Sequence, residues 1–371
     1  MRIGIDARLW NETGIGRYIR NLVENLQKID KKNEYVLFVK TGFKDRSFGF
    51  DQDKSLNWKV VETAIHWHSF EEQIKFPSIL NKENLDLMHF PYFSLPIFYK
   101  KPFVVTIHDL IINNFPTGKA STLPYPLYLL KRMGYSSVLQ HAVRNSRKII
   151  VPLNAVKDDV LGTFGVSEDK IAVTYEGVSE MTDGKLLKAN PSVEKYFLYV
   201  GNAYPHKNLE RLVEAFIEFK KIIKTNIQLL LVGKNDYFYK YLRAKVNQEK
   251  IEGLVFKHDL SDQELFELYK NANMFISASL MEGFGLPPLE AMSASCPVLL
   301  SDIPSFREVC KDAAFYFDPY SINSIKQQME LVYNLGQKAR EEKIKKGLER
   351  IKYFSWQKMA EQTLKVYENS V

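Results

Sequence analysis

The stretch Met274–Ala291, MFISASLMEGFGLPPLEA, places a short apolar run directly before a glycine-containing loop and a helix start marked by prolines. Met274–Ser277 has the length and composition of a buried strand. Gly283 and Gly285 allow the chain to turn tightly, and the prolines that follow suit the first helical positions, where a backbone N–H is not needed. A strand that leads through such a loop into a helix is typical of a doubly wound α/β fold.

The same alternation extends outward from this stretch in both directions and predicts parallel sheets. In the first half we expect strands near Ile3–Ile5, Tyr35–Val39, Leu85–His89, Phe103–Ile107, Lys148–Val151 and Ile171–Thr174. Helices are expected over Gly16–Gln27 and Pro126–Asn145, and one from Ser69, which has capping-box spacing to Glu72. In the second half we expect strands near Phe197–Val200, Gln228–Val232, Met274–Ser277, Pro297–Leu300 and Ala314–Phe317. Helices there are expected over Leu209–Ile223, Asp262–Asn271 and Pro287–Ser293.

The chain of 371 residues is long enough for two domains. The polar stretch Ser179–Ser192 has no apolar period and is the predicted linker. We therefore expect two Rossmann-like domains, 1–180 and 193–354, with a C-terminal helix over 355–371 that crosses back to the first domain. The carboxyl ends of the strands in both domains would face a central cleft, where ligands of such folds bind.

Composition limits the functional classes. The chain carries 51 basic and 44 acidic residues, a net charge of +7, and has two cysteines, too few for a disulfide framework. No run of 18 apolar residues occurs, and the first residues read as a strand, not as a signal peptide. The basic residues are scattered, without zinc-ligand spacing or an RNA-binding aromatic box, which argues against nucleic acid as a partner. We expect a cytoplasmic protein.

The loop and helix start in Met281–Ala291 carry the first functional hypothesis. A helix N-terminus aims unpaired N–H groups and a positive dipole end at a ligand, and a diphosphate suits that environment. Glu282 precedes the loop and Glu290 lies in the first turns of the helix, where carboxylates accept hydrogen bonds from sugar hydroxyls. A plain strand-to-helix turn with a carboxylate that favours the helix dipole explains the same residues one by one. The two glutamates, the glycines and the prolines in this order indicate a ligand site more specifically than any one of them does.

Lys207 follows the expected Phe197–Val200 strand and precedes a helix. A cation at a strand end would stabilise a leaving nucleotide diphosphate as negative charge builds on it. The alternative is a solvated lysine at a helix start.

The segment EGFGLPPLE, followed by AMSASCPVLLSDIPSFREV, resembles the donor-site signature of the family 4 retaining glycosyltransferases with the GT-B fold. The resemblance covers nearly the whole chain, and the Glu-x7-Glu pattern is its specific part. It also includes Ile5–Gly16, Thr106–Leu110 (TIHDL), Gly201–Leu209 (GNAYPHKNL), Leu231–Lys234 (LVGK) and Phe354–Trp356.

The resemblance implies a role for each matching residue. It assigns Glu290 to the ribose hydroxyls, Glu282 to the transferred sugar and Lys207 to the diphosphate. The donor-binding backbone around these residues is Gly283, Phe284, Gly285 and Leu286. In the first domain, which binds the acceptor in this family, His108 ends a strand and is assigned to contact with the transferred sugar. His108, Glu282 and Lys207 are thus the expected catalytic residues.

Other candidates in the first half are weaker. Gly14 and Gly16 lie at the start of an expected helix, and their backbone amides would point at the phosphates or the acceptor. An ordinary tight turn before the helix explains the two glycines as well. Asp6 and Arg17 lie near these glycines in the sequence, and both are weak candidates for the same site. His89 ends a strand, where a packing role is favoured over acceptor contact. His66 and His68 alternate on one expected strand face, but two ligands alone are a poor metal site.

The chain departs from the family at one position. Many members carry an arginine shortly before the lysine, where this chain has Asn202. Either His206 or Arg211 is a candidate for the missing positive charge, unless backbone amides suffice.

No cofactor and no catalytic metal are expected. Glycosyltransferases of the other large class hold a cation with an Asp-x-Asp at a strand end, but Asp51 and Asp53 lie in a polar loop without a buried strand before it. No carboxylate pair is placed as in glycosidases. The resemblance implies retention of configuration, with a donor phosphate oxygen helping to remove the acceptor proton. Orientation and exclusion of water are then the tasks of the protein.

The stretch Leu123–Met133, LPYPLYLLKRM, combines apolar side chains with Lys131 and Arg132, and Tyr99–Lys101 lies upstream. Such a face would rest on an anionic bilayer and suit a lipid-linked acceptor. The alternative is a buried helix whose cations extend to solvent.

The members that look most similar are bacterial mannosyltransferases of surface-polysaccharide assembly, so GDP-mannose is the leading donor and a UDP-sugar the next. The base contacts are expected near Lys234 and Lys257–Leu260. A nucleotide-sugar epimerase or hydrolase on the same fold is the second enzyme hypothesis. A nucleotide-sugar-binding module without turnover is the non-enzymatic one.

Overall fold

The computed structural model describes residues 1–43, 57–115, 125–178, 195–223 and 226–371. The chain divides into two compact units. Unit 1 comprises Met1–Gly177 and Ser355–Val371, and unit 2 comprises Val178–Phe354. The expected linker Ser179–Ser192 lies outside the described residues.

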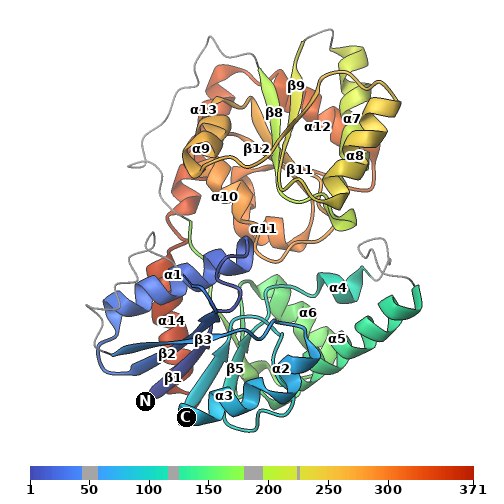
Figure 1. Cartoon of the computed structure of the whole chain (residues 1–371). Helices are drawn as coiled ribbons and strands as arrows, with labels where there is room; N and C mark the ends of the chain where they lie inside the picture. Colours follow the sequence, from blue (N-terminus) through green and yellow to red (C-terminus); the bar gives the residue numbers. More distant parts are fainter. Residues whose placement is uncertain (44–56, 116–124, 179–194, 224–225) are drawn as a thin grey trace. The chain divides into compact units, whose positions relative to one another are not determined.

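Unit 1 contains a seven-stranded parallel sheet of order β3-β2-β1-β4-β5-β6-β7 (Figure 1). Its strands are β1 (Arg2–Asp6), β2 (Glu34–Lys40), β3 (Trp58–Thr63), β4 (Leu87–Phe90), β5 (Phe103–Thr106), β6 (Ile149–Val151) and β7 (Ile171–Val173). The central strands are buried along nearly their whole length, as expected for a sheet covered on both faces. The order reverses between β1 and β4, so their carboxyl ends form the switch point of this sheet.

The helices of unit 1 are α1 (Gly14–Ile29), α2 (Phe70–Ile74), α3 (Phe76–Lys82), α4 (Ile111–Asn114), α5 (Tyr125–Asn145), α6 (Asn154–Phe164), the short η1 (Glu168–Lys170) and α14 (Trp356–Glu368). The last helix, α14, packs against α1, so both ends of the chain belong to one unit. A Cβ on Gly177 would lie 2.2 Å from the backbone nitrogen of Trp356, which explains why a residue without a side chain stands where the two segments meet.

Unit 2 contains a six-stranded parallel sheet of order β10-β9-β8-β11-β12-β13. Its strands are β8 (Tyr196–Val200), β9 (Gln228–Val232), β10 (Leu254–Lys257), β11 (Met274–Ser277), β12 (Val298–Ser301) and β13 (Phe315–Phe317). Its helices are η2 (Pro205–Lys207), α7 (Leu209–Ile222), α8 (Tyr237–Gln248), α9 (Asp262–Asn271), α10 (Leu286–Ser293), α11 (Pro304–Cys310), η3 (Lys311–Ala313), α12 (Ile322–Tyr333) and α13 (Gln337–Ile351).

The core of unit 2 lies between its sheet and the packed pair α7 and α12. Phe197 and Leu231 from the sheet meet Phe216 from α7 and Met329 from α12, and each is fully buried. The order of this sheet reverses between β8 and β11, so the segments that follow these two strands leave the sheet side by side.

Two edge strands were missed in the sequence. Each of β3 and β10 pairs with a single neighbour, and their exposed or half-buried positions blur the apolar pattern. The expectation that His66 and His68 share a strand face is wrong, because β3 ends at Thr63 and His68 adopts a positive φ of 57° in a turn. The capping of α2 by Ser69, which accepts a hydrogen bond from the Glu72 amide, is confirmed.

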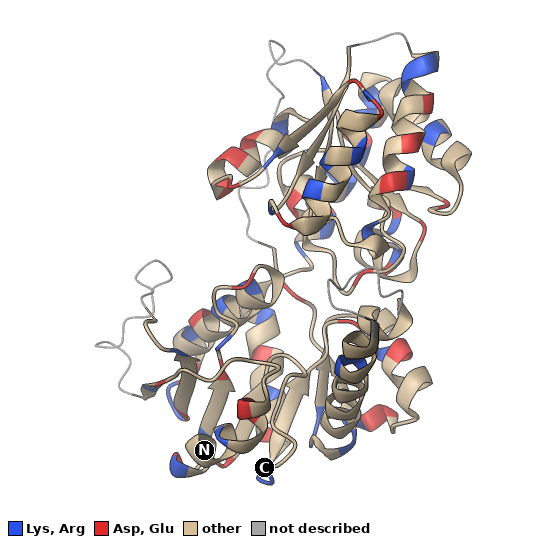
Figure 2. Cartoon of the chain, turned by 45° about the vertical axis from the view of Figure 1, so that its right-hand side comes forward, with Lys and Arg blue, Asp and Glu red and all other residues tan. Residues whose placement is uncertain are grey.

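Basic and acidic positions are interspersed along the helices of each unit (Figure 2). This matches the scattered lysines and arginines of the sequence.

Candidate functional site

The switch point of unit 2 brings together two of the predicted side chains. Lys207 ends η2, in the segment after β8, and Glu282 lies in the loop after β11. The Nζ of Lys207 donates to Oε1 of Glu282 at 2.7 Å, and the Ser279 hydroxyl donates to the same oxygen at 2.6 Å. The side chains of Lys207 and Glu282 are 15% and 13% exposed. This ion pair is therefore mostly buried, but part of each side chain remains accessible to solvent.

Glu282 is held in its ionised form. Burial on its own raises the pKa of this carboxyl, but the charge and hydrogen bond of Lys207 and the hydrogen bond of Ser279 outweigh burial and leave the pKa below its ordinary value. Glu282 can therefore accept hydrogen bonds from hydroxyl groups, but at neutral pH it has no proton to donate. Ser279, which the sequence did not single out, is thus a second donor to the oxygen that Lys207 contacts.

The loop after Glu282 ends in an uncapped helix start. Gly285 is the N-cap of α10, so no side chain is present at that position to bind the first amides of the helix. It has a φ of 81°, and a Cβ there would lie 2.9 Å from the ring of Phe306. A glycine is required on both counts. No side-chain hydrogen bond caps the first N–H groups of α10.

Glu290 lies in the second turn of α10 and is buried. Its Oε2 accepts a hydrogen bond from the Tyr269 hydroxyl of α9 at 2.9 Å. The carboxylate is thereby oriented from a neighbouring helix. Tyr269 is 21 positions away in the chain, and no spacing rule would have linked the two residues.

The residues near the missing family arginine have other tasks. Arg211 donates from Nη1 to Oδ1 of Asn208 at 2.8 Å and to the Pro319 carbonyl at 3.2 Å. Burial, followed by the charge of Lys207, lowers the pKa of His206 to about 4. At neutral pH His206 is therefore uncharged and does not replace an arginine, and Arg211 is engaged in holding two loops together.

In unit 1 the predicted His108 lies just beyond β5. Its Nδ1 is 3.1 Å from Oε1 of Glu176, and its Nε2 is 2.9 Å from the Pro91 carbonyl oxygen. Glu176 follows β7 and was not singled out in the sequence. The structure thus brings the ends of three segments, after β4, β5 and β7, to one imidazole ring.

Gly14 and Gly16 at the start of α1 differ in how closely the surrounding atoms pack against them. A Cβ on Gly16 would lie 2.4 Å from the carbonyl oxygen of Trp10, so close backbone packing requires this glycine. A Cβ on Gly14 would meet nothing within 4 Å. Packing therefore explains Gly16 and leaves Gly14 without a structural reason of that kind.

His89 is fully buried. Its Nδ1 lies 2.7 Å from the Tyr367 hydroxyl of α14, and its Nε2 lies 2.8 Å from the Thr106 hydroxyl. Burial, followed by the charge of His108, lowers its pKa to about 3. It is a neutral core residue that ties α14 to the sheet.

A buried charge cluster after β1 was not predicted. Arg8 donates to both carboxylate oxygens of Asp6, at 2.8 and 2.6 Å, and to Oε1 of Glu72 at 2.6 Å. Ser94 donates to Glu72 as well. Arg8 and Glu72 are each 1% exposed in their side chains, and Asp6 is 9% exposed. Asp6, weakly assigned to the site, is thus part of an ion network that holds α2 to the sheet.

The described parts of the chain contain no group of three or more His, Cys, Asp and Glu side chains placed to hold a metal ion. Asp51 and Asp53, the letters of the Asp-x-Asp pattern, lie outside the described residues.

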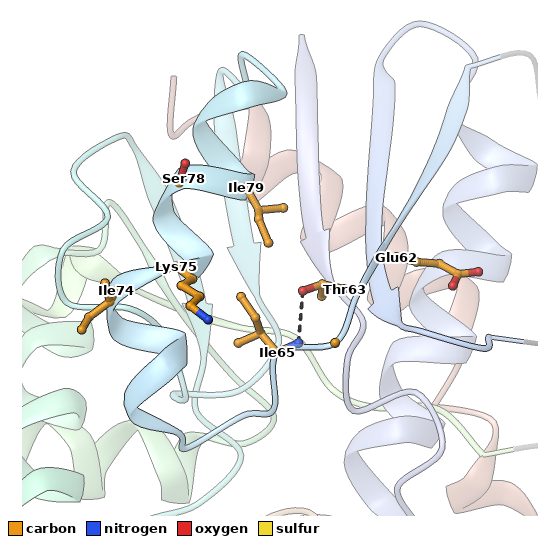
Figure 3. Close-up of a pocket in the computed structure, with 8 residues that line it drawn as sticks. Glu62, Thr63, Ile65, Ile74, Lys75, Ser78 and Ile79 are labelled. Atoms are coloured by element: carbon orange, nitrogen blue, oxygen red, sulfur yellow. Dashed lines mark hydrogen bonds between the residues drawn. The ribbon is translucent and has the colours of Figure 1, made fainter.

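A shallow groove of about 560 Å³ opens at the end of β3 and along α2 and α3 (Figure 3). It is lined by Ile65, Ile74 and Ile79 together with Glu62 and Lys75. None of the predicted site residues lines it, so it does not belong to the site.

The described part of the predicted membrane stretch forms the start of α5 and is exposed. Leu127, Leu130 and Met133 are 54%, 67% and 68% exposed, and Lys131 and Arg132 lie among them on the surface. A buried helix does not fit this exposure. In the residues that the structure describes, we find no helix with the length and apolarity that crossing a membrane requires.

Two family descriptions match the chain, one in each half. Residues 13–180 match Glycosyltransferase Family 4, and residues 187–350 match Glycosyl transferases group 1. The expected catalytic and donor-binding residues all fall within these two ranges.

Curated relatives are similar over most of the chain. The O-antigen chain mannosyltransferase RfbU of Salmonella typhimurium is 28% identical over 254 residues, 68% of this chain and 66% of the relative. The O-antigen chain mannosyltransferase B of Escherichia coli is 28% identical over an alignment that covers 96% of each chain.

Solved structures share the fold at low identity. Sucrose-phosphate synthase from Thermosynechococcus elongatus gives a TM-score of 0.75 at 18% identity, covering 100% of this chain and 98% of that one. Anabaena HepE, solved in complex with UDP and glucose, gives a TM-score of 0.73 at 14% identity and covers 100% of both chains.

Proposed function

The chain belongs to the family 4 glycosyltransferases and has their GT-B fold of two Rossmann-like α/β domains, and from this premise we propose that it transfers a sugar from a nucleotide-diphosphate donor to a glycan or lipid-linked acceptor. One observation carries the proposal. The ion pair of Lys207 and Glu282 lies directly before the uncapped start of α10, at the switch point of the unit 2 sheet.

The donor phosphates are held by this helix start and by Lys207. The amides of Phe284, Gly285 and Leu286 supply partial positive charge, and Lys207 supplies a full one. Lys207 faces Glu282 in the structure, so it can approach the diphosphate while keeping part of its contact with the carboxylate. As the bond to the sugar breaks, negative charge on the leaving diphosphate strengthens both interactions, which is how they lower the barrier.

The two glutamates hold the rest of the donor. Glu282 is ionised and accepts hydrogen bonds from hydroxyls of the transferred sugar. Glu290, oriented by Tyr269, accepts those of the ribose. His108 is assigned to the sugar from unit 1, and Gly14 and Gly16 to the phosphates or the acceptor.

Transfer proceeds with retention and without a metal or other cofactor. The ionised state of Glu282 makes it unsuited to protonate a leaving group, in keeping with a mechanism in which a donor phosphate oxygen assists removal of the acceptor proton. The protein orients the two substrates and stabilises charge.

GDP-mannose is the leading donor, since the two relatives described above are named mannosyltransferases. A UDP-sugar is the second choice, and it has support only at the level of the fold. We assign the protein to surface-polysaccharide assembly at the cytoplasmic face of the membrane.

Contact with the membrane is proposed through the start of α5. Leu127, Leu130 and Met133 form its apolar part, and each nearby cation adds roughly 1 kcal/mol of attraction to an anionic bilayer. Vesicles with phosphatidylglycerol should sediment the protein, and vesicles of phosphatidylcholine alone should not. Leu130→Gln with Lys131→Gln should reduce binding, whereas Leu331→Gln, at a 47% exposed position of unit 2, should not. Equal sedimentation of both variants would exclude this surface.

The decisive test of function is a donor panel. The purified protein is incubated with GDP-mannose or UDP-sugars, with and without a lipid-linked acceptor, and release of nucleoside diphosphate is measured. We expect GDP release that depends on the acceptor, an α-linked product by NMR, and no loss on addition of a chelator. Release without acceptor would identify a hydrolase, and binding without release a nucleotide-sugar-binding module. UDP release alone would replace the donor assignment.

A further inference from the structure

Both nitrogen atoms of the His108 ring face a hydrogen-bond acceptor. Nδ1 lies 3.1 Å from Oε1 of Glu176, and Nε2 lies 2.9 Å from the carbonyl oxygen of Pro91. A carbonyl oxygen and an ionised carboxylate have no proton to donate. A neutral imidazole has one N–H, so one of its nitrogens would turn a lone pair toward an oxygen. With both nitrogens protonated, the ring donates both bonds.

Burial and a restrained backbone stabilise the contact between His108 and Glu176. The side chains of His108 and Glu176 are 13% and 7% exposed, so little water competes for them. Glu176 precedes Gly177, whose close approach to the backbone of Trp356 fixes the segment against the start of α14. The carboxylate is therefore presented to the ring by a restrained backbone.

The groups packed around the ring favour its charge. Burial works against a cation at His108, but Glu176, and to a smaller extent Asp109, raise its pKa above the ordinary value of 6.5. Tyr18 of α1 meets the ring edge-on at 4.8 Å, and burial raises its pKa, so it stays neutral. His89 is neutral as well. His108 is thus the one ring in this group whose surroundings favour a positive charge.

An alternative places the shared proton on Glu176, which would then donate to a neutral ring. Free imidazole is the stronger base by about two pKa units, so the proton belongs on His108 unless its surroundings reverse that order. The negative charge of Asp109 supports that order, because it favours a proton on His108.

We propose that Glu176 is a positioning residue for the transfer reaction, which keeps His108 as an imidazolium that only donates hydrogen bonds. This inference rests on the proposed function, which assigns His108 to the donor sugar. The Nδ1–H group of His108 keeps its hydrogen bond to Glu176. Its Nε2–H group donates to both the Pro91 carbonyl and an oxygen of the bound donor. An imidazolium has no lone pair on its ring nitrogens, so His108 is not the base that removes the acceptor proton.

The charge on His108 can be measured without any substrate. The chain has 7 histidines, and their ring signals are followed by NMR over pH, with His108→Asn to assign the signal. We expect His108 to titrate above 6.5 in the native protein. Glu176→Gln should lower its pKa by about one to three units, and Glu176→Asp, which keeps the charge, by less. Glu168→Gln, at an exposed position near β7, is the matched control and should change nothing. A native His108 that titrates below 6.5, or one that Glu176→Gln leaves unchanged, overturns the proposal.

The pH dependence of kcat separates positioning from a structural role. Glu176→Gln should move the alkaline limb to lower pH, with up to about tenfold lower kcat per unit of pKa shift at alkaline pH. The two enzymes should converge at acid pH. An equal loss at every pH would indicate a structural role and overturn the proposal. If the native protein releases no nucleoside diphosphate with any donor, the proposed function fails, while the NMR titration still decides the charge on His108.

Discussion

Six strands follow the same order in the sheets of both units, but the charged clusters of the two units differ in their exposure to solvent. In unit 2, Lys207 and Glu282 follow adjacent strands and remain 15% and 13% exposed. In unit 1, Arg8 and Glu72 are 1% exposed in their side chains and lie among further buried partners. A cation that solvent still reaches can exchange part of its contact for a ligand. One that is sealed among carboxylates can only hold the fold together.

The difference shows that a strand end with charged residues is not by itself a binding site. The switch point of each sheet gathers such residues, and burial limits which of them a ligand can reach. The expected effects of substitution follow the same division, with loss of stability in unit 1 and loss of donor use in unit 2.

The largest effect is expected in unit 1. Arg8→Ala leaves two buried carboxylates without their cation and should lower the free energy of unfolding by about 3–5 kcal/mol. Urea denaturation measures this change. Arg307→Ala removes an exposed pair with Asp302 and should cost less than about 1 kcal/mol. Similar losses in the two variants would contradict the distinction between closed and open charge pairs.

In unit 2, Lys207→Ala should lower kcat/KM for the donor by about 10²–10³-fold, because a charge that stabilises the leaving diphosphate is lost. Its circular dichroism spectrum should stay native. Lys221→Ala, on the same unit but in an exposed pair with Glu218, should retain full activity. Wild-type turnover by Lys207→Ala would remove the assignment of this lysine.

A smaller effect is expected for the ribose contact. Glu290→Ala should weaken binding of the nucleoside diphosphate by about 10- to 100-fold, since it removes a charged acceptor. Tyr269→Phe removes the hydrogen bond that orients Glu290 and should weaken binding by about fivefold. Calorimetric titration measures both. A larger effect of the tyrosine than of the glutamate would reverse their roles.

The smallest effect concerns pH. The pKa of Glu282 is below its ordinary value of 4.5, so its ionised form stabilises the folded state above that pH. This stabilisation should decline as pH falls through the folded pKa. Thermal unfolding between about pH 6 and pH 3 should show a shallower acid decline in Lys207→Met than in the native protein. Parallel curves would mean that the ion pair does not set this pKa.

Local order was predictable to a good extent. The helix Asp262–Asn271 and the strand Met274–Ser277 were predicted with the bounds that the structure shows. A capping box at Ser261 marks the start of this helix, and an apolar run marks the strand, so both signals lie within or next to the element. The edge strands β3 and β10 were missed because one side of each is open to solvent, which removes the continuous apolar signal.

The sequence by itself determined the alternation of strands and helices, the glycine loop before α10 and the place of Lys207 between a strand and a helix. Each depends on residues a few positions apart. Only the tertiary structure decided which charges meet. His108 and Glu176 are 68 positions apart, Lys207 and Glu282 are 75 apart, and Arg8 and Glu72 are 64 apart. Parallel strands carry such distant residues to one edge of a sheet, and the energy of each pair depends on distance and burial, which no local pattern encodes.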